Sequence, residues 1–432
     1  MRILVFQQAA WDDTNSVGNT LSNWFGEWDE DVFADFYTRK QTPNNHIVSE
    51  YYTVSAKDLI NPILRKNRQK RRFKATDLHA SMKDIEKQRE AELKDIEKLH
   101  HMKNRNLTYW IVESIWRSKI WLDSEFKSFV SDFKPDILFA FGASTYMLDP
   151  LISFVKRELD TKVVLFIADD VYGQYKRQWY VRRRYLLKSY KNCMRKADLV
   201  YGASEEICQV YGNRFNRSVI PLYKGCEFTH TTPKAFNNPL RIVYAGNLLY
   251  GRDETLSRIA DSLESINSLK LEAVLEIYTG TEISSEVERK LNRGASSRIM
   301  GKRPFSEIQT ILSEADIVLH VESYDAKQIE VVKYSLSTKI IDCLESGSLV
   351  LGVGPDSVSS IMYIQRIPGA KCISDLNDLT NELVKLIHMS DEQKQNCINT
   401  IREYAAKNHS IHSVRKRLRT DFVSLMRTKK QN

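Results

Sequence analysis

Cysteine is scarce in this chain of 432 residues, and its six copies stand apart from one another. They lie at Cys193, Cys208, Cys226, Cys343, Cys372 and Cys397, and no two of them form a CxxC pair. Zinc sites usually take closely spaced cysteines, and disulfide frameworks belong to oxidising compartments. The spacing therefore argues against a zinc site and in favour of a reducing compartment.

The sequence also lacks a charged and then apolar leader and an apolar run long enough to cross a bilayer. Met1 and Arg2 lead directly into an apolar strand pattern over residues 3–6. The most apolar long window, residues 136–155, is interrupted by Asp149 and Pro150 and falls short of a bilayer span. We therefore predict a cytoplasmic protein that touches the inner face of the cell membrane only peripherally.

Length and charge set further bounds. A chain of 432 residues is too long for one average core, so two domains are expected. The hydrophobic fraction of 42% is typical of a globular protein. The net charge is +9, but 55 acidic residues accompany the basic ones, so a basic surface has to be local to matter.

The first half of the chain alternates apolar strand patterns with helical ones. Strands are expected over 2–6, 31–37, 136–141, 163–168, 197–201 and 219–222. Such alternation predicts a parallel sheet covered on both faces, with sites at the carboxyl ends of its strands. Asp170 follows one of these strands. Gly18 lies between the first strand and an amphipathic stretch, where the free N–H groups of a helix start can bind anions or hydroxyls; a plain tight turn explains this glycine equally well.

Residues 57–131 differ from the rest and are predicted to be a helical insertion. A basic run occupies 65–74, and 83–103 is rich in charges of both signs at the four-residue spacing that supports an exposed helix. Trp110, Trp116 and Trp121 are placed on a following helix.

A linker-like composition over 223–240 precedes a second strand–helix series. Its strands are expected over 241–245, 274–278, 298–300, 317–321 and 349–353, and a last amphipathic helix over 411–426. We therefore expect a second α/β domain that begins near residue 225.

Three motifs in this half join strands to polar side chains. YAGNLLYGR (244–252) runs into a glycine-flanked loop that ends in Arg252, whose guanidinium can bind phosphate through two hydrogen bonds. ADIVLHVES (315–323) delivers Glu322 and Ser323 at a strand end. STKIIDCLESG (337–347) carries Lys339 and Asp342 on one helix, where a cation suits phosphate and a carboxylate suits sugar hydroxyls.

In this order the motifs resemble the donor-binding domain of GT-B glycosyltransferases, in particular the large retaining family of bacterial polysaccharide transferases. The resemblance implies an α/β fold with two Rossmann-like domains facing each other across a cleft. Residues 1–224 would bind the acceptor, 225–410 would bind a nucleotide sugar, and 411–432 would form a helix that crosses back to the first domain.

The resemblance also implies roles for single residues. Gly246 matches the family's loop, Arg252 takes the place of its lysine, and Asn247 stands where the family has an arginine. Glu322 would face the donor sugar and Asp342 would hold the ribose, although residues 324–334 lengthen the usual spacing.

The remaining expected contacts are of two kinds. Ser323, Lys339 and Ile340 would complete the donor site. Gly18 and, weakly, Asp170 would serve the acceptor side. The nucleoside-diphosphate sugar is the substrate, no cofactor is expected, and a metal ion is not needed because cations and amides would stabilise the leaving diphosphate.

Residues 176–196 contain no acidic side chain and interleave cations with Trp179, Tyr180, Tyr185 and Tyr190. Basic residues with interfacial aromatics suit an anionic membrane surface. The same composition can bind nucleic acid, which we do not expect here, or form a solvated helix face.

The predicted function is sugar transfer from a nucleoside-diphosphate sugar to a glycan, carried by a lipid, in cell-surface polysaccharide synthesis. Two alternatives stay open. One is a non-catalytic GT-B partner of an active transferase, and the other is a nucleotide-sugar epimerase of the same architecture.

Overall fold

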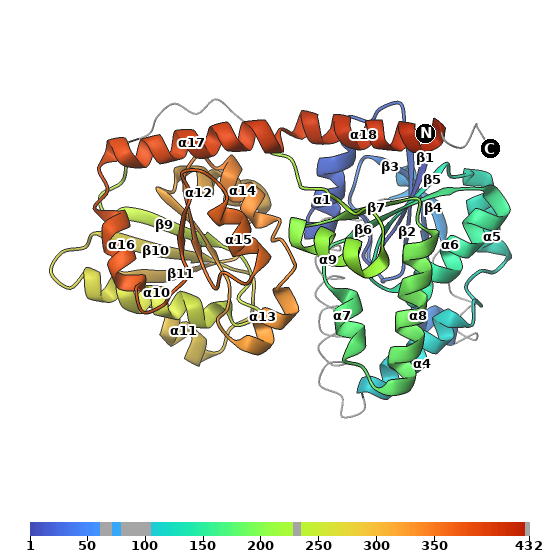
Figure 1. The fold of residues 1–432 in the computed structure, drawn as a ribbon, viewed down its shortest axis with the longest axis horizontal. Helices are drawn as coiled ribbons and strands as arrows, with labels where there is room; N and C mark the ends of the chain where they lie inside the picture. Colours follow the sequence, from blue (N-terminus) through green and yellow to red (C-terminus); the bar gives the residue numbers. More distant parts are fainter. Residues whose placement is uncertain (61–70, 79–104, 228–234, 428–432) are drawn as a thin grey trace. The chain divides into compact units, whose positions relative to one another are not determined.

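The computed structural model describes residues 1–60, 71–78, 105–227 and 235–427, and these divide into two compact units. Unit 1 comprises Met1–Leu222 and Arg415–Asn432, and unit 2 comprises Tyr223–Val414. Figure 1 labels the elements of both units. The sequence had placed the division between 224 and 225, within the same connection.

Unit 1 is built on an eight-stranded sheet with the strand order β4-β3-β2-β1-β5-β6-β7-β8. Its strands are β1 (Arg2–Phe6), β2 (Val32–Tyr37), β3 (Val48–Thr53), β4 (Arg72–Lys74), β5 (Ile137–Phe141), β6 (Lys162–Ile167), β7 (Leu199–Gly202) and β8 (Ile220–Pro221). Its helices are α1 (Ser16–Phe25), α2 (Ala56–Ile60), the short 3₁₀ turn η2 (Ala75–Asp77), α4 (Arg105–Arg117), α5 (Ser124–Phe133), α6 (Thr145–Leu159), α7 (Val171–Lys176), α8 (Tyr180–Lys196) and α9 (Glu205–Phe215).

Unit 2 is built on a six-stranded sheet with the order β11-β10-β9-β12-β13-β14, and every pair in it is parallel. Its strands are β9 (Leu240–Ala245), β10 (Ala273–Tyr278), β11 (Ser297–Gly301), β12 (Ile317–Val321), β13 (Leu349–Val353) and β14 (Lys371–Ile373). Its helices are α10 (Arg252–Ile266), α11 (Ser285–Leu291), α12 (Phe305–Glu314), α13 (Ala326–Val332), α14 (Lys339–Glu345), α15 (Ser359–Gln365), α16 (Leu379–Ile387) and α17 (Asp391–His409), followed by α18 (Ile411–Arg427).

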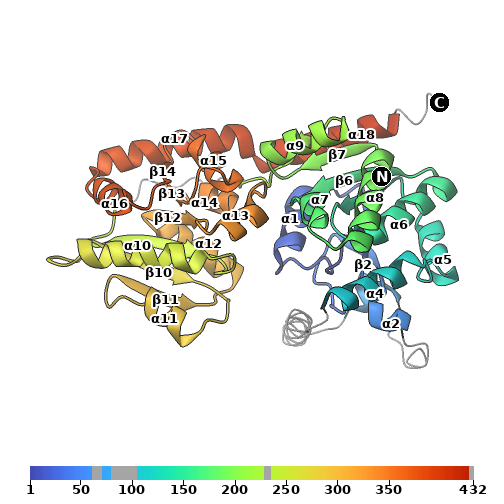
Figure 2. The same ribbon diagram turned by 60° about the horizontal axis from the view of Figure 1, so that its bottom comes forward.

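These sheets confirm the predicted α/β class. Every residue of β12 and β13 is buried, because helices cover both faces of the unit 2 sheet. Helices α10, α11 and α16 gather on one face of it, and α14, α15 and α17 on the other (Figures 1 and 2). Gly347, at φ +71°, ends α14 and turns the chain into β13, as the sequence predicted.

Aromatic side chains fill the core of unit 1. The ring of Phe422 on α18 lies 5.6 Å from that of Trp28 and 6.1 Å from that of Phe25. The Tyr201 hydroxyl donates to the Asp421 carboxylate at 2.6 Å. The last helix therefore begins in unit 2 and ends as part of the core of unit 1.

The predicted helical insertion is partly wrong. Its segment Arg72–Lys74 forms β4, which pairs antiparallel with β3. The Arg72–Glu50 ion pair and the stacked rings of Phe73 and Tyr51, 5.3 Å apart, hold β4 there. Trp121 lies between α4 and α5 rather than on a helix. The strands β3 and β14 also went unpredicted. The rest of the basic run (65–70) and the charge-rich stretch 83–103 lie outside the described residues.

Candidate active site

The three motifs of the second half meet at one edge of the unit 2 sheet. Strand β12 pairs with both β9 and β13, so the segments that follow β9 and β12 leave the sheet side by side. Helix α14 leads into β13, and its first residue, Lys339, also reaches this edge: a Cβ added to Gly246 would lie 2.5 Å from the Lys339 Nζ. Sequence order alone does not bring these segments together.

Arg252, the first residue of α10, is 9% exposed and is held by groups from two segments. Its Nε donates to the Val321 carbonyl at 3.2 Å, and its Nη1 donates to the Asn247 Oδ1 at 2.8 Å. Its Nη2 lies 3.3 and 3.1 Å from the two carboxylate oxygens of Glu322. A guanidinium carries five N–H groups, so these contacts fix its plane without using every donor.

Glu322 is 1% exposed and lies at the centre of this arrangement. Besides Arg252, the His320 Nε2 lies 3.0 Å from its Oε1. Burial raises the pKa of Glu322, but the hydrogen bond from His320 and the charge of Arg252 more than offset it, so the pKa lies below its usual value. The carboxylate is thus held ionised, and it positions the Arg252 guanidinium.

Lys339 supplies a second cation. Burial and the positive charge of Arg252 lower the pKa of Lys339 to about 8. Within the described residues no carboxylate lies within 4.0 Å of its amine. Two neighbouring cations of which only Arg252 is paired with a buried carboxylate leave an excess of positive charge, which suits an anionic group.

The loop between β9 and α10 has two consecutive residues with left-handed backbone conformations, Tyr250 (φ +62°) and Gly251 (φ +73°). A Cβ on Gly251 would lie 2.6 Å from the Ser323 Oγ, so glycine permits both the conformation and the close approach to the segment that follows β12. Ser323 is 3% exposed and accepts from the Asp325 N–H at 3.1 Å. The predicted donor residues Gly246, Asn247 and Ser323 therefore lie around Arg252.

Asp342 follows Lys339 by three residues on α14 and pairs with Lys224, whose Nζ lies 2.7 Å from its Oδ1. Ile340, which was predicted to contact the ligand, is fully buried in the hydrophobic core of unit 2, and its N–H donates to the Ser337 carbonyl at 3.1 Å. We therefore leave Ile340 out of the proposed site.

Solved structures resemble the whole chain. They include HepE from Anabaena in complex with UDP and glucose, at 12% identity and a TM-score of 0.63, covering 98% of this chain and 100% of that one. An α,α-trehalose-phosphate synthase (UDP-forming) from Burkholderia vietnamiensis matches at 10% identity and a TM-score of 0.61, covering 100% and 99%. The enzyme of that name from Burkholderia xenovorans, in complex with glucose-6-phosphate, matches at 9% identity and a TM-score of 0.58, covering 98% and 100%. The chain has the GT-B fold.

The GT-B fold is what these likenesses establish, since identities near 10% do not carry an activity with them. No protein-family model matches the chain, and no curated protein sequence matches it significantly. The function therefore has to be argued from the site.

The two acceptor-side residues predicted for the GT-B fold have partners within unit 1. Asp170 caps α7 by accepting from the Gly173 N–H at 2.9 Å, and it also binds Tyr211 and Arg214 at 2.8 and 2.9 Å. Gly18 lies in the first turn of α1, and a Cβ there would lie 2.1 Å from the Asp12 carbonyl oxygen. The close approach of the Asp12 backbone explains why position 18 is a glycine. That Gly18 or Asp170 contacts an acceptor stays a prediction.

Sequence reasoning missed three partners of the site. His320 was expected to be a satisfied core histidine; it is buried, and its partner is the Glu322 carboxylate. Thr255 donates to the Glu322 carbonyl at 2.9 Å, and Lys224, at the start of the predicted linker, binds Asp342. The spacing of His320 on β12 and Glu322 directly after it, two residues apart in extended chain, was the available signal, because such residues share a face.

Among the residues that the structure describes, no group of three or more His, Cys, Asp or Glu side chains could hold a metal ion. No helix of the described part is long and apolar enough to cross a membrane.

Proposed function

We propose that this protein is a glycosyltransferase that moves a sugar from a nucleoside diphosphate to a glycan acceptor carried by a lipid, in the synthesis of a cell-surface polysaccharide. The observation that carries the donor side is the half-buried Lys339 amine, which has no carboxylate partner among the described residues and lies near the fixed Arg252 guanidinium. The structures that share the fold include one in complex with UDP and glucose, which supports a donor of this class.

In the proposed reaction the bond between the anomeric carbon and the diphosphate oxygen breaks with its electron pair on that oxygen. A bond from the anomeric carbon to an acceptor hydroxyl oxygen forms as that hydroxyl passes its proton to the departing diphosphate. Negative charge develops on the departing diphosphate. Cations that are already oriented stabilise this charge without reorganising, which is often the largest single contribution to catalysis. We assign this role to Arg252, oriented by Glu322 and Asn247, and to Lys339.

The nucleoside half of the donor would meet α14. The side chain of Asp342 is 18% exposed, and Lys224 holds it in place. A carboxylate fixed in this way can accept hydrogen bonds from two neighbouring ribose hydroxyls. The family resemblance alone implies retention of configuration. Independence of metal ions is proposed because cations and amides would stabilise the leaving diphosphate. The lipid-linked acceptor is proposed from the basic and aromatic stretch 176–196.

The experiment is a calorimetric titration with UDP, GDP and ADP, followed by a search for sugar transfer with the matching nucleotide sugars. Wild-type protein should bind at least one of the nucleoside diphosphates, and Lys339→Ala should weaken that binding. Lys270→Ala, an exposed lysine elsewhere in unit 2, is the matched control and should bind as wild type does. No binding by the wild type to any of the three would overturn the proposal.

A second candidate is a non-catalytic partner that keeps the GT-B fold. It is favoured by Asn247, which stands at the family's arginine position and whose Oδ1 is occupied by Arg252 at 2.8 Å. Such a partner can bind a nucleotide without turning over a donor. Binding of a nucleoside diphosphate together with no transfer and no hydrolysis of any of the nucleotide sugars would select it.

A further inference from the structure

Helix α8 carries an exposed row of positive charge along its whole length. Arg184, Lys188, Lys191 and Arg195 follow one another at spacings of four, three and four residues, and all four are exposed. The helix contains no acidic residue. Within the described residues none of these four cations forms an ion pair with a carboxylate, so the row faces solvent with its charge uncompensated.

Exposed apolar side chains gather where α8 begins. Trp179, Tyr180 and Val181 are 43%, 62% and 50% exposed, and on α4 Leu107 and Ile111 are 53% and 46% exposed. Large apolar side chains exposed as a cluster, rather than singly, mark a surface that meets another apolar phase.

The two groups form one surface because α4 and α8 are joined. The rings of Trp110 and Trp179 lie 6.3 Å apart, and Trp110 stands between Leu107 and Ile111 on α4. The Arg182 guanidinium binds the Glu113 carboxylate at 2.6 Å, and both residues are buried. Breaking a buried ion pair is costly, so this contact keeps the two helices in a fixed arrangement.

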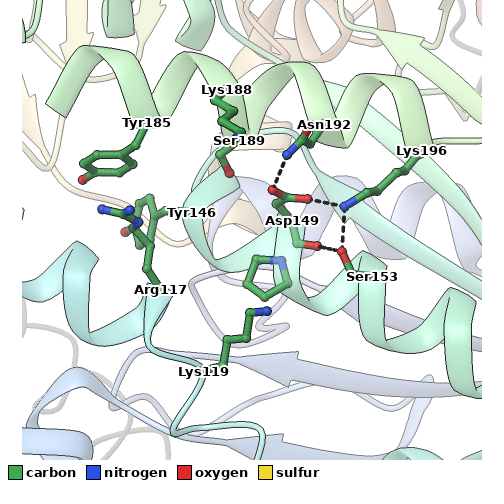
Figure 3. A pocket seen from close by; sticks show the side chains of 11 residues that line it. Arg117, Lys119, Tyr146, Asp149, Ser153, Tyr185, Lys188, Ser189, Asn192 and Lys196 are labelled. Atoms are coloured by element: carbon green, nitrogen blue, oxygen red, sulfur yellow. Dashed lines mark hydrogen bonds and ion pairs between the residues drawn. The ribbon is translucent and has the colours of Figure 1, made fainter. Parts of the chain in front are cut away.

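A pocket of about 320 Å³ opens beside the basic row, between α6, α8 and the end of α4 (Figure 3). Its cationic lining residues are Arg117, Lys119, Lys188 and Lys196. Its one acidic lining residue, Asp149, is occupied by the Lys196 Nζ at 2.6 Å and by the Asn192 amide at 2.9 Å. Three cations of the pocket therefore remain for an anionic group of small size.

We propose that this α4–α8 surface docks on a bilayer that contains anionic phospholipid, with the apolar cluster at the acyl boundary and a headgroup phosphate in the pocket. Basic residues near an anionic leaflet and aromatic residues at its interface both favour such binding. The sequence pointed only to residues 176–196, whereas the structure adds α4 and the pocket. This inference does not rest on the proposed function, because it concerns unit 1 alone.

Nucleic acid is the competing partner for a basic surface, and the apolar cluster decides against it. Contacts to a phosphate backbone come from cations and polar groups, and they give no reason to expose Leu107, Ile111 and Val181 together.

The test is vesicle flotation of the full chain with phosphatidylcholine alone and with phosphatidylcholine and phosphatidylglycerol at a ratio of about 3:1. We expect binding to the anionic vesicles and little to the neutral ones. The double variant Lys188→Glu with Lys191→Glu should lower the vesicle affinity at least about tenfold. Its matched control, Lys270→Glu with Lys407→Glu, makes the same charge change on exposed residues of unit 2 and should bind as wild type does.

A second variant and its control separate the contribution of apolar insertion to vesicle binding from the contribution of charge. Val181→Ser with Leu107→Ser should weaken binding to anionic vesicles at high salt, where charge is screened. Leu269→Ser, at a fully exposed position of unit 2, should not. Circular dichroism checks that each variant is folded.

Equal binding to neutral vesicles, or no binding to either kind, would overturn the proposal. Binding of free glycerol phosphate in the pocket at millimolar concentration, together with no binding to anionic vesicles, would assign the pocket to a soluble phosphate instead. Salt-dependent binding to a duplex or single-stranded oligonucleotide with no vesicle binding would assign the surface to nucleic acid. Binding of UDP by the charge variants is measured alongside, so a failure of this proposal stays separate from a failure of the proposed donor site.

Discussion

The two units bury carboxyl groups in opposite ways. In unit 2, Glu322 contacts Arg252 and His320, and its pKa lies below the usual value. In unit 1, Asp35 on β2 is fully buried, accepts from the Trp11 N–H at 2.9 Å, and forms no ion pair within the described residues. Burial raises its pKa to about 7. A buried carboxyl is therefore charged or neutral according to its partners, and burial alone does not decide which.

The cations of the two units also differ in their partners and in their exposure to water. Arg252 is buried against a carboxylate that fixes its orientation, whereas Lys339 lacks one and its pKa falls to about 8. The four cations of the basic row on α8 are exposed, and water solvates them. Fixed, partly desolvated cations suit one small ligand in one orientation, whereas solvated cations in a row suit an extended charged surface.

Arg252→Ala should have the largest effect on the difference between the two buried carboxyl groups, because it would leave Glu322 buried without the guanidinium that pairs with it. We expect unit 2 to lose about 3–5 kcal/mol of stability. All seven tryptophans lie in unit 1, so tryptophan fluorescence follows unit 1 and circular dichroism at the same denaturant concentrations adds unit 2. The unfolding transition of unit 2, seen by circular dichroism, should shift to lower denaturant concentration. The transition of unit 1, seen by tryptophan fluorescence, should not shift. Arg252→Ala with Glu322→Gln should recover much of the loss, and equal stability of the two variants would contradict the role given to the ion pair.

Asp35 provides the opposite case in unit 1. The unfolded carboxyl ionises near pH 3.8 and the folded one near 7, so in this range the folded state holds the proton and stability falls as pH rises. The loss should reach up to about 4 kcal/mol above pH 7. Asp35→Asn keeps an acceptor for the Trp11 N–H and should remove this slope. Parallel stability curves of wild type and variant, followed by tryptophan fluorescence between pH 4 and 8, would show that Asp35 does not titrate there.

Lys339→Ala should weaken nucleoside-diphosphate binding by roughly tenfold to a hundredfold, because it removes a charge-assisted contact to phosphate. Unlike Arg252→Ala, it should leave the stability of unit 2 unchanged or slightly higher, since it deletes a poorly solvated cation with no carboxylate partner. Calorimetry and denaturant unfolding of the same preparation measure both effects. A large loss of stability would mean that Lys339 serves the fold rather than a ligand.

The pH dependence of nucleotide binding should be the smallest of these effects. Lys339 loses its proton near pH 8, so affinity for an anion should be full below that value and fall by up to about tenfold by pH 9. Lys339→Arg keeps the charge throughout and should flatten the profile. An unchanged profile in the arginine variant would trace the pH dependence to another group.

Local pattern was sufficient for much of the fold. The apolar runs of β12 and β13 predicted buried parallel strands, and the glycine at 347 predicted where α14 ends. The three-residue β4 and β14 have no such run, and β4 exists because Glu50 and Tyr51 on the neighbouring strand hold it. Short edge strands depend on partners far along the chain, which periodicity does not report.

The sequence by itself determined the strands and helices that carry the three motifs of unit 2 and which polar residues stand at their strand ends, because side-chain periodicity and turn residues are local properties. Only the tertiary structure decided which of these residues meet. Arg252 and Glu322 are separated by 70 residues, and they touch because β9 and β12 are neighbours in a sheet whose order does not follow the chain. The same contacts decided that Glu322 is paired, that Lys339 is not, and that α4 and α8 share one surface.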